Sequence, residues 1–265
     1  MLANLAIFAA PKRGCSMEEY EDAHWVDPNG SEEIASQSLR VVVADGASES
    51  LLAGRWAKRL SSAIGTASRT TGTRRGFIAA YQVAVTQWAV DVACYVAERE
   101  ARDAPIQWFE EPGLEKGAHA AIIVVDFLDG KGNTPPRWRA VAVGDCCLFQ
   151  VRDDKLHTSF PLQDENAFSY QPPLLSSRGA EYSIVSRHAT LTSGTWQHDD
   201  SFYVVTDALA AWFLRSAHAG TRPWVPLRDL DTSDFEMNFE SWVASQRDNG
   251  TLRDDDTTLV RVDLY

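Results

Sequence analysis

The sequence predicts an α+β fold, and two observations lead to this prediction. Apolar, β-branched segments bounded by turn residues recur along the chain, which indicates many strands. Two long segments with apolar residues at helical spacing lie together between the second and third of these strands. Strands in long blocks with helices inserted in pairs are typical of α+β layering and differ from strict β-α-β alternation.

The predicted strands account for most of the apolar runs. Each is rich in Val, Ile, Leu or aromatic residues and stops at Gly, Asp, Asn or Pro, which is the usual composition of a strand and of its ends. They cover residues 2–9, 39–44, 120–127, 138–143, 148–151, 182–185, 202–206 and 257–262.

Four helices are predicted from apolar residues three to four positions apart. The first two cover residues 52–64 and 77–96, and the turn at 70–73 between them makes them a helical hairpin. A third helix begins directly after Asp207, and a fourth covers 235–243 before Asn249-Gly250 ends it.

Residues 164–179 contain Pro172-Pro173 and several Ser residues without a clear period. This composition predicts a long surface loop, as an ordinary connection or as a mobile flap. No segment has the composition of a linker, so we expect one domain over residues 1–265.

Composition and charge exclude several classes of function. Hydrophobic residues make up 45% of the 265 residues and charged residues 23%, which is enough for a sizeable core. The formal net charge of −12 disfavours binding to nucleic acid or to an anionic membrane.

Targeting signals and cysteines point to a cytoplasmic protein. Residues 1–10 have no basic residues before their apolar part, so they do not fit a secretory signal peptide. No apolar run looks long enough to span a bilayer. The four cysteines show no C-x-x-C spacing, and we expect them to be reduced.

Carboxylates at strand ends are the main functional signal. Mg²⁺ and Mn²⁺ prefer carboxylate and water oxygens, so several acids at one mouth of a sheet can form a cation site. The alternative for each single acid is an ordinary turn, where Asp binds nearby backbone. The acids are Glu21-Asp22, Asp45-Gly46, Gly144-Asp145, Asp207 and Asp254-Asp255-Asp256.

In order and spacing these segments resemble those of the type 2C, metal-dependent protein serine/threonine phosphatases. Two positions differ from the family pattern, as in divergent bacterial members. The resemblance covers nearly the whole chain, although each motif is weak alone. The similar segments are Glu21-Asp22-Ala23-His24, Val42-Val43-Ala44-Asp45-Gly46, Gly117-Ala118-His119-Ala120, Val143-Gly144-Asp145, Val204-Val205-Thr206-Asp207 and residues 253–260.

The resemblance implies a fold and a metal site. The fold is a four-layer α-β-β-α sandwich, with two mainly antiparallel sheets flanked by pairs of antiparallel helices and the metals at one end. The cofactors are two divalent cations, Mn²⁺ or Mg²⁺, and a third is an open option. The implied site residues are Asp45 as bridging carboxylate, the Gly46 carbonyl, Asp207, Asp255, Glu21 and Asp22 through bound waters, and Asp145 as an outer or third-metal ligand.

The last acidic motif leaves an ambiguity of register, because three aspartates are consecutive. Counting back from Thr258 favours Asp255 as the ligand. Asp256 then takes the place of the family's frequent Asn, and Asp254 is a solvated loop charge.

The implied chemistry is hydrolysis of a phosphomonoester. Two divalent ions about 3.5 to 4 Å apart can lower the pKa of a bridging water, which then attacks phosphorus in line. No side-chain nucleophile is needed. Cys146 and Arg152 have the C-x5-R spacing of thiol phosphatases, but the residues between them include the predicted strand 148–151, so we do not expect them to form a phosphate-binding loop.

Two positions depart from the family pattern. The family's phosphate-binding Arg before the first acidic motif is missing, since Met17, Glu18 and Glu19 stand there. Lys12 or Arg13 is a candidate replacement, and the alternative is that both are solvated surface charges.

The histidine often assigned as general acid is missing as well, because Ala47-Ser48-Glu49 follows Asp45-Gly46. His24 is a candidate proton donor if its side chain faces the metals, and the alternatives are a structural role for it and a metal-bound water as acid.

Three functions follow from the resemblance. The first is removal of phosphate from phosphoserine or phosphothreonine of a protein partner, such as a Ser/Thr kinase or its target. The second is a catalytically weak module that binds a phosphorylated or metal-dependent partner. The third is a metal-dependent phosphatase of small metabolites.

Overall fold

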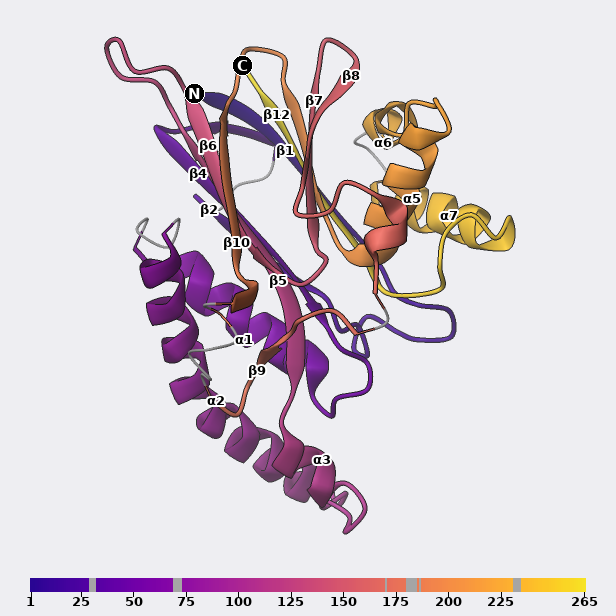
Figure 1. Cartoon of the computed structure of the whole chain (residues 1–265). Coiled ribbons are helices and arrows are strands. Elements are labelled where there is room, and N and C mark those ends of the chain that lie inside the picture. Colours follow the sequence, from indigo (N-terminus) through magenta and orange to yellow (C-terminus); the bar gives the residue numbers. More distant parts are fainter. Residues whose placement is uncertain (29–31, 69–72, 170, 180–184, 186, 231–234) are drawn as a thin grey trace.

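The computed structural model describes residues 1–28, 32–68, 73–169, 171–179, 185, 187–230 and 235–265. Two antiparallel sheets lie face to face, and helices cover the outer face of each (Figure 1). The predicted α+β class and its α-β-β-α layering are therefore confirmed.

The first sheet has six strands in the order β3-β1-β12-β11-β7-β8. Two neighbouring interior strands, β1 and β12, come from the two ends of the sequence and pair from Ala3 with Leu264 to Ala10 with Thr257. The bounds are β1 Leu2–Ala10, β3 Glu32–Ala35, β7 Cys147–Arg152, β8 Lys155–Phe160, β11 Ser201–Val205 and β12 Thr257–Leu264.

The second sheet has the order β10-β6-β5-β4-β2, and the short strand β9 pairs with β5. Its central strands β4 and β5 are apolar on both faces, because one face meets the other sheet and the other meets helices. The bounds are β2 Ala23–Asp27, β4 Ser38–Gly46, β5 His119–Leu128, β6 Arg137–Val143, β9 Leu175–Ser176 and β10 Thr190–Thr195.

Alternation along β4 explains the layers. Leu39, Val41 and Val43 point into the core between the sheets. Val42 and Ala44 point the other way, toward the first pair of helices. A strand that is buried on both faces reads as a continuous apolar run, which is what the sequence shows.

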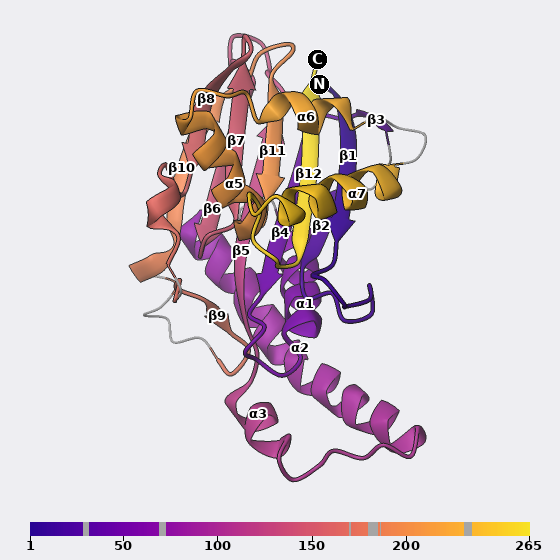
Figure 2. The ribbon, with the colours of Figure 1, turned by 90° about the vertical axis from the view of Figure 1, so that its right-hand side faces the viewer.

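The helices α1 (Ala53–Thr66) and α2 (Arg74–Ala101) form the predicted hairpin on the outer face of the second sheet. They are antiparallel, because Arg55 and Arg59 near the start of α1 form ion pairs with Glu98 and Asp91 near the end of α2. Figure 2 shows that α2 extends beyond the sheet, and Arg99 near its end forms an ion pair with Glu110, directly before α3 (Glu111–Lys116).

The outer face of the first sheet carries α5 (Asp207–His218), α6 (Trp224–Asp229) and α7 (Phe235–Asp248). The stacked rings of Phe149 on β7 and Phe213 on α5, 4.1 Å apart, anchor this layer. The predicted third and fourth helices are thus confirmed, and α7 ends before Asn249-Gly250 as expected.

Some sequence predictions fall outside the description or need correction. Of the strand predicted at 182–185 only Val185 is described, and it is helical, so the strand prediction is wrong there. Of the turn predicted at 70–73 only Thr73 is described. The loop predicted at 164–179 contains a short 3-10 helix, Glu165–Ala167, and strand β9.

The expectation that no segment could span a bilayer was wrong for α2. By length and composition alone, this 28-residue helix could cross a membrane. Its inner side is nevertheless part of the core, since Phe77, Tyr81 and Trp88 are buried against α1 and the second sheet. A core helix passes the same test, so the indication is weak.

Candidate metal centre

Strand register brings the predicted acidic segments to one end of the sandwich. The last residues of β1 and β4 pair with the first residues of β12 and β5, respectively. The start of β2 pairs with the end of β4, and the end of β11 with the start of β7. Both chain termini lie at the opposite end (Figure 1). Acids from loops distant in sequence therefore meet here.

Asp45 and Gly46 form the end of β4 at the centre of this site. A side chain at Gly46 would lie within 2.7 Å of the Glu21 carbonyl oxygen and 2.8 Å of the Ala53 backbone, so only Gly permits the close approach of these loops. Burial raises the pKa of Asp45 well above its usual value, and the charges of four aspartates raise it further. These four are Asp22, Asp207, Asp145 and Asp255.

Asp207 and Asp145 lie beside Asp45 at the ends of the first sheet. Asp207 is the first residue of α5 and is largely buried. Its Oδ1 atom is buried without a hydrogen-bond partner among the described residues. Asp145 follows Gly144, whose φ of +97° and contact with Ala121 exclude a side chain. Burial, followed by the charge of Asp207, raises the pKa of Asp145 to about 7.

The three consecutive aspartates before β12 point in different directions. Asp255 accepts a hydrogen bond from Arg253, which also contacts Asp207, so Asp255 faces the group around Asp45. Asp256 is buried and accepts from the backbone N–H groups of Lys12 and Glu21 at 2.8 and 2.7 Å. Asp254 accepts from the backbone N–H of Arg13.

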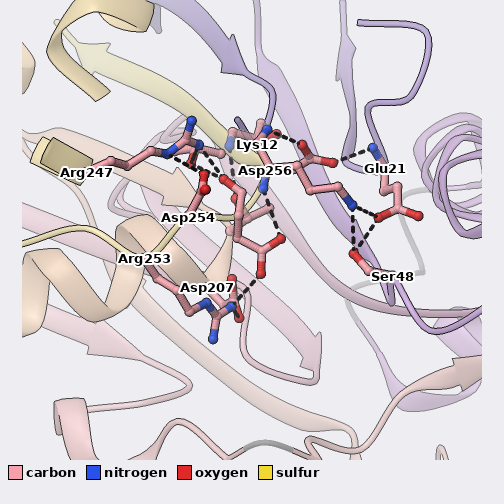
Figure 3. Close-up of polar contacts among 12 residues, drawn as sticks. Lys12, Glu21, Ser48, Asp207, Arg247, Arg253, Asp254 and Asp256 are labelled. Atoms are coloured by element: carbon pink, nitrogen blue, oxygen red, sulfur yellow. Dashed lines mark hydrogen bonds and ion pairs between the residues drawn. The ribbon is translucent and has the colours of Figure 1, made fainter. Parts of the chain in front are cut away.

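The first acidic motif contributes one partly exposed and one buried carboxylate. Glu21 accepts hydrogen bonds from the Lys12 ammonium group, at 2.8 Å, and from Ser48. Asp22 is 2% exposed and accepts from the Thr258 hydroxyl at 2.8 Å. Burial raises the pKa of Asp22 well above its usual value. Asp22 thus ties the motif to β12, whereas Glu21 faces the side where Lys12 and Ser48 lie (Figure 3).

The candidate proton donor and phosphate ligands occupy distinct places. His24 lies on β2 opposite Val43 and is exposed, and partial desolvation of its ring lowers its pKa. The Lys12 side chain is paired with Glu21. The Arg13 guanidinium is paired with Asp248 at the end of α7.

Two arginines at this end were not singled out in the sequence. Arg253 contacts Asp207 and Asp255 through its Nη2 atom, as Figure 3 shows for Asp207. Arg247 on α7 is 5% exposed and donates to the backbone oxygens of Pro11 and Asp255. The only signal for Arg253 was its place beside the last acidic motif, and α7 gave no signal for Arg247.

The donor set fits hard divalent cations. At least four carboxylates act on Asp45, whose own carboxylate accepts no hydrogen bond from the described residues. Such a group is costly without positive charge, and oxygen ligands are those that Mg²⁺ and Mn²⁺ prefer. In the described part of the chain, only Asp164, Glu165 and His218 offer three ligand atoms within 4.8 Å of one another. The acidic end is therefore more spread out than a single compact shell of ligands.

Comparisons with known proteins bear on the fold. No family model matches the chain, and no curated protein matches it. Solved structures do match over the full length. The serine/threonine phosphatase of S. agalactiae is similar with a TM-score of 0.59 and 11% identity, covering 99% of this chain and 100% of that one.

Two further matches were solved with metal ions. The catalytic domain of the phosphatase PstP, in complex with two manganese ions, gives a TM-score of 0.53 at 16% identity and covers 99% of both chains. RsbX in complex with magnesium gives 0.51 at 14% identity and covers 100% of this chain and 96% of that one. The chain therefore has the fold of the metal-dependent serine/threonine phosphatases, as its motifs suggested.

Proposed function

We propose that this protein is a metal-dependent phosphatase that removes phosphate from phosphoserine or phosphothreonine of a protein partner. The observation that carries the proposal is the convergence of Asp22, Asp145, Asp207 and Asp255 on Asp45. Aspartates from both sheets meet at one end of a fold shared with such phosphatases.

The cation ligands proposed are Asp45, the Gly46 carbonyl, Asp207 and Asp255, with Asp145 beside them and Glu21 and Asp22 acting through water. Two divalent cations, Mn²⁺ or Mg²⁺, would supply the positive charge that a phosphate dianion needs and would lower the pKa of the attacking water. The buried, unpartnered Oδ1 of Asp207 supports this assignment, because a buried acceptor without a partner is costly.

The surrounding residues hold this arrangement. Asp256 joins the loop after β1 to the loop before β2 by accepting from both backbones. Arg247 joins the loop after β1 to the last acidic motif, because it donates to the backbone oxygens of Pro11 and Asp255. Both contacts keep Asp255 and Glu21 on the same side of the sandwich, which a site built from loops requires.

A cavity beside the site supports a polypeptide substrate. It has a volume of about 1080 Å³ and is lined by residues before β2, by the start of α1 and by the end of α2. Glu21 belongs both to this cavity and to the acidic end, so a chain carrying the phosphate can extend into the cavity. We infer a cytoplasmic setting, with a Ser/Thr kinase or its target as partner and one catalytic domain over residues 1–265.

Hydrolysis of p-nitrophenyl phosphate tests the chemistry. We expect activity that depends on Mn²⁺ or Mg²⁺ and falls by about 1000-fold or more in Asp45→Asn, since loss of a bridging ligand removes charge stabilisation of the transition state. Metal-independent activity, or equal activity in the variant, would rule out the two-metal mechanism.

The substrate class is tested with phosphopeptides and sugar phosphates. Lys58 is an exposed residue that lines the cavity. We expect Lys58→Ala to lower kcat/KM for phosphopeptides and to leave p-nitrophenyl phosphate hydrolysis unchanged. A preference for sugar phosphates, with no effect of the variant on peptides, would favour a metabolite phosphatase.

A regulatory binding module is the second candidate function. The absence of the family's Arg and His from their usual positions favours it. It predicts binding of Mn²⁺ and of a phosphopeptide with no turnover of either substrate class.

A further inference from the structure

Four basic side chains surround the acidic end, and three of them have other partners. Lys12 binds Glu21 and Ser48, and Arg13 binds Asp248. Arg247 is buried and donates to backbone oxygens. Arg253 alone among these four contacts two of the proposed cation ligands.

The geometry of Arg253 leaves part of its guanidinium available. Its Nη2 atom contacts Asp207 Oδ2 and lies 2.9 Å from Asp255 Oδ2. Within the described part of the chain, the Nε and Nη1 atoms have no hydrogen-bond partner, and the side chain is 53% exposed. The group therefore sits at the mouth of the site with donors to spare.

A phosphate substrate needs such a donor. Guanidinium binds phosphate oxygens with two parallel N–H bonds, which gives both charge and orientation. In the segment before the first acidic motif, where the family has this Arg, the chain has Met17, Glu18 and Glu19, so the cation must come from elsewhere.

We propose that Arg253 is the phosphate-positioning residue of this site and that its ion pairs with Asp207 and Asp255 hold it at the mouth until divalent cations take those carboxylates. This inference rests on the proposed function. The same residue then neutralises the carboxylates in the metal-free protein and holds a phosphate oxygen in the metal-loaded one.

The competing candidates are less well placed. Release of Lys12 would leave Glu21 with Ser48 as its only side-chain partner among the described residues. The Arg13 guanidinium is paired with Asp248 at the end of α7, and the Arg13 backbone donates to Asp254. Release of Arg253 costs little, because its partners gain a divalent cation in exchange.

Calorimetry on the purified full chain tests the inference without turnover. In Mn²⁺-loaded protein, we expect Arg253→Gln to weaken binding of inorganic phosphate by about 10- to 100-fold, the range for a lost hydrogen bond to a charged group. Arg253→Lys keeps the charge but not the fork, so its loss is smaller. Arg253→Gln also raises KM for p-nitrophenyl phosphate.

Metal binding supplies the second readout. Removal of a competing cation is expected to tighten Mn²⁺ binding of Arg253→Gln by up to about 5-fold, as for a partly exposed ion pair. Arg215→Gln is the matched control, because Arg215 is exposed and donates to Thr251 O near the same loop. We expect the affinities of Arg215→Gln for phosphate and for Mn²⁺ to stay within about 2-fold of the wild type, as for surface substitutions.

The outcomes separate this inference from the proposed function. Wild-type hydrolysis with an unchanged phosphate affinity in Arg253→Gln overturns the role of Arg253 and leaves the phosphatase standing. If phosphate binding depends on Arg253 but the protein hydrolyses nothing, the role of Arg253 stands and the phosphatase is overturned. Weaker Mn²⁺ binding in Arg253→Gln would show that Arg253 only holds the loop and would overturn the exchange, and a wild type that binds no Mn²⁺ overturns both.

Discussion

Two buried charge clusters of this molecule differ in how completely their carboxylates are paired with cations. Under the end of α1, Arg40 and Asp126 are 0% and 1% exposed and form a fork of two bonds of 2.6 and 3.1 Å. The same guanidinium donates to the Ala67 carbonyl beyond the helix end. At the acidic end, by contrast, Asp45 is surrounded by other carboxylates and Arg253 is the cation in direct contact with them.

The difference separates a structural cluster from the candidate metal centre. Asp126 is paired with the buried Arg40 and with the partly exposed Arg139, and Arg40 also donates to carbonyls at the end of α1, so the buried carboxylate needs no cation from solution. The acidic end retains excess negative charge in a partly buried place, which folding alone does not favour. An unbalanced cluster of this kind is evidence for a ligand of opposite charge.

The largest expected effect comes from breaking the balanced cluster. Asp126→Asn leaves Arg40 charged and buried, so we expect the free energy of unfolding to fall by about 3 to 5 kcal/mol. Chemical denaturation measures it. The control is Asp91→Asn, which breaks a partly exposed pair with Arg59 and is expected to cost less than about 1 kcal/mol. Equal losses in both variants would contradict the contrast.

The pH dependence of the metal-free protein is the next largest effect. Burial raises the pKa of Asp145 to about 7, so the folded state binds a proton that the unfolded state has released above about pH 4. This stabilisation is present at low pH and lost as pH rises toward 7. We expect roughly 2 to 4 kcal/mol less stability at pH 8 than at pH 5.

Saturating Mn²⁺ provides the control for this pH effect. When cations balance the carboxylates, stability should no longer fall as pH rises. A metal-free protein whose melting temperature is flat or increases from pH 5 to 8 would contradict the unbalanced charge.

A smaller effect with the opposite sign is expected at the centre of the acidic end. Asp45→Asn removes one of the repelling charges, so the metal-free protein should gain about 1 kcal/mol, in the range of other stabilising substitutions. The same variant should lose the rise in melting temperature that Mn²⁺ gives the wild type. Destabilisation without metal would indicate that Asp45 has a structural role.

The smallest effect is expected at Asp254. It is 48% exposed, accepts from the Arg13 backbone and forms a long ion pair of 3.6 Å with the buried Arg247. Asp254→Asn should therefore change Mn²⁺ affinity by less than about 0.5 kcal/mol, and any loss of stability comes from the Arg247 pair. Asp255→Asn is the matched comparison and should weaken Mn²⁺ binding strongly. If Asp254→Asn had the larger effect on Mn²⁺, the ligand assignment would be off by one residue.

The sequence predicted the central strands and missed the edges. The seven central strands of the two sheets were each expected from apolar runs, since both of their faces are buried. The four strands at the sheet edges, β2, β3, β8 and β10, were not. Thr190–Thr195, for example, has mostly exposed or half-exposed side chains and no apolar run, so it carries no periodic signal.

For the site, the sequence predicted which acids gather but not which cations accompany them. Acids at strand ends could be placed because register brings those ends together. Arg253, Arg247 and the Arg40–Asp126 pair depend on contacts between segments far apart in the chain, such as the 86 positions between Arg40 and Asp126. Local patterns contain no information on such contacts.

The central claim is that the acidic end binds divalent cations through Asp45, Asp207 and Asp255. Anomalous diffraction from crystals soaked in Mn²⁺ tests it most directly. We expect manganese peaks between these three carboxylates, with oxygen distances of about 2.1 to 2.2 Å as for small hard cations, and with Asp254 and Asp256 out of contact. A soaked crystal without a peak at this end, or with manganese held by Asp254 or Asp256, would contradict it.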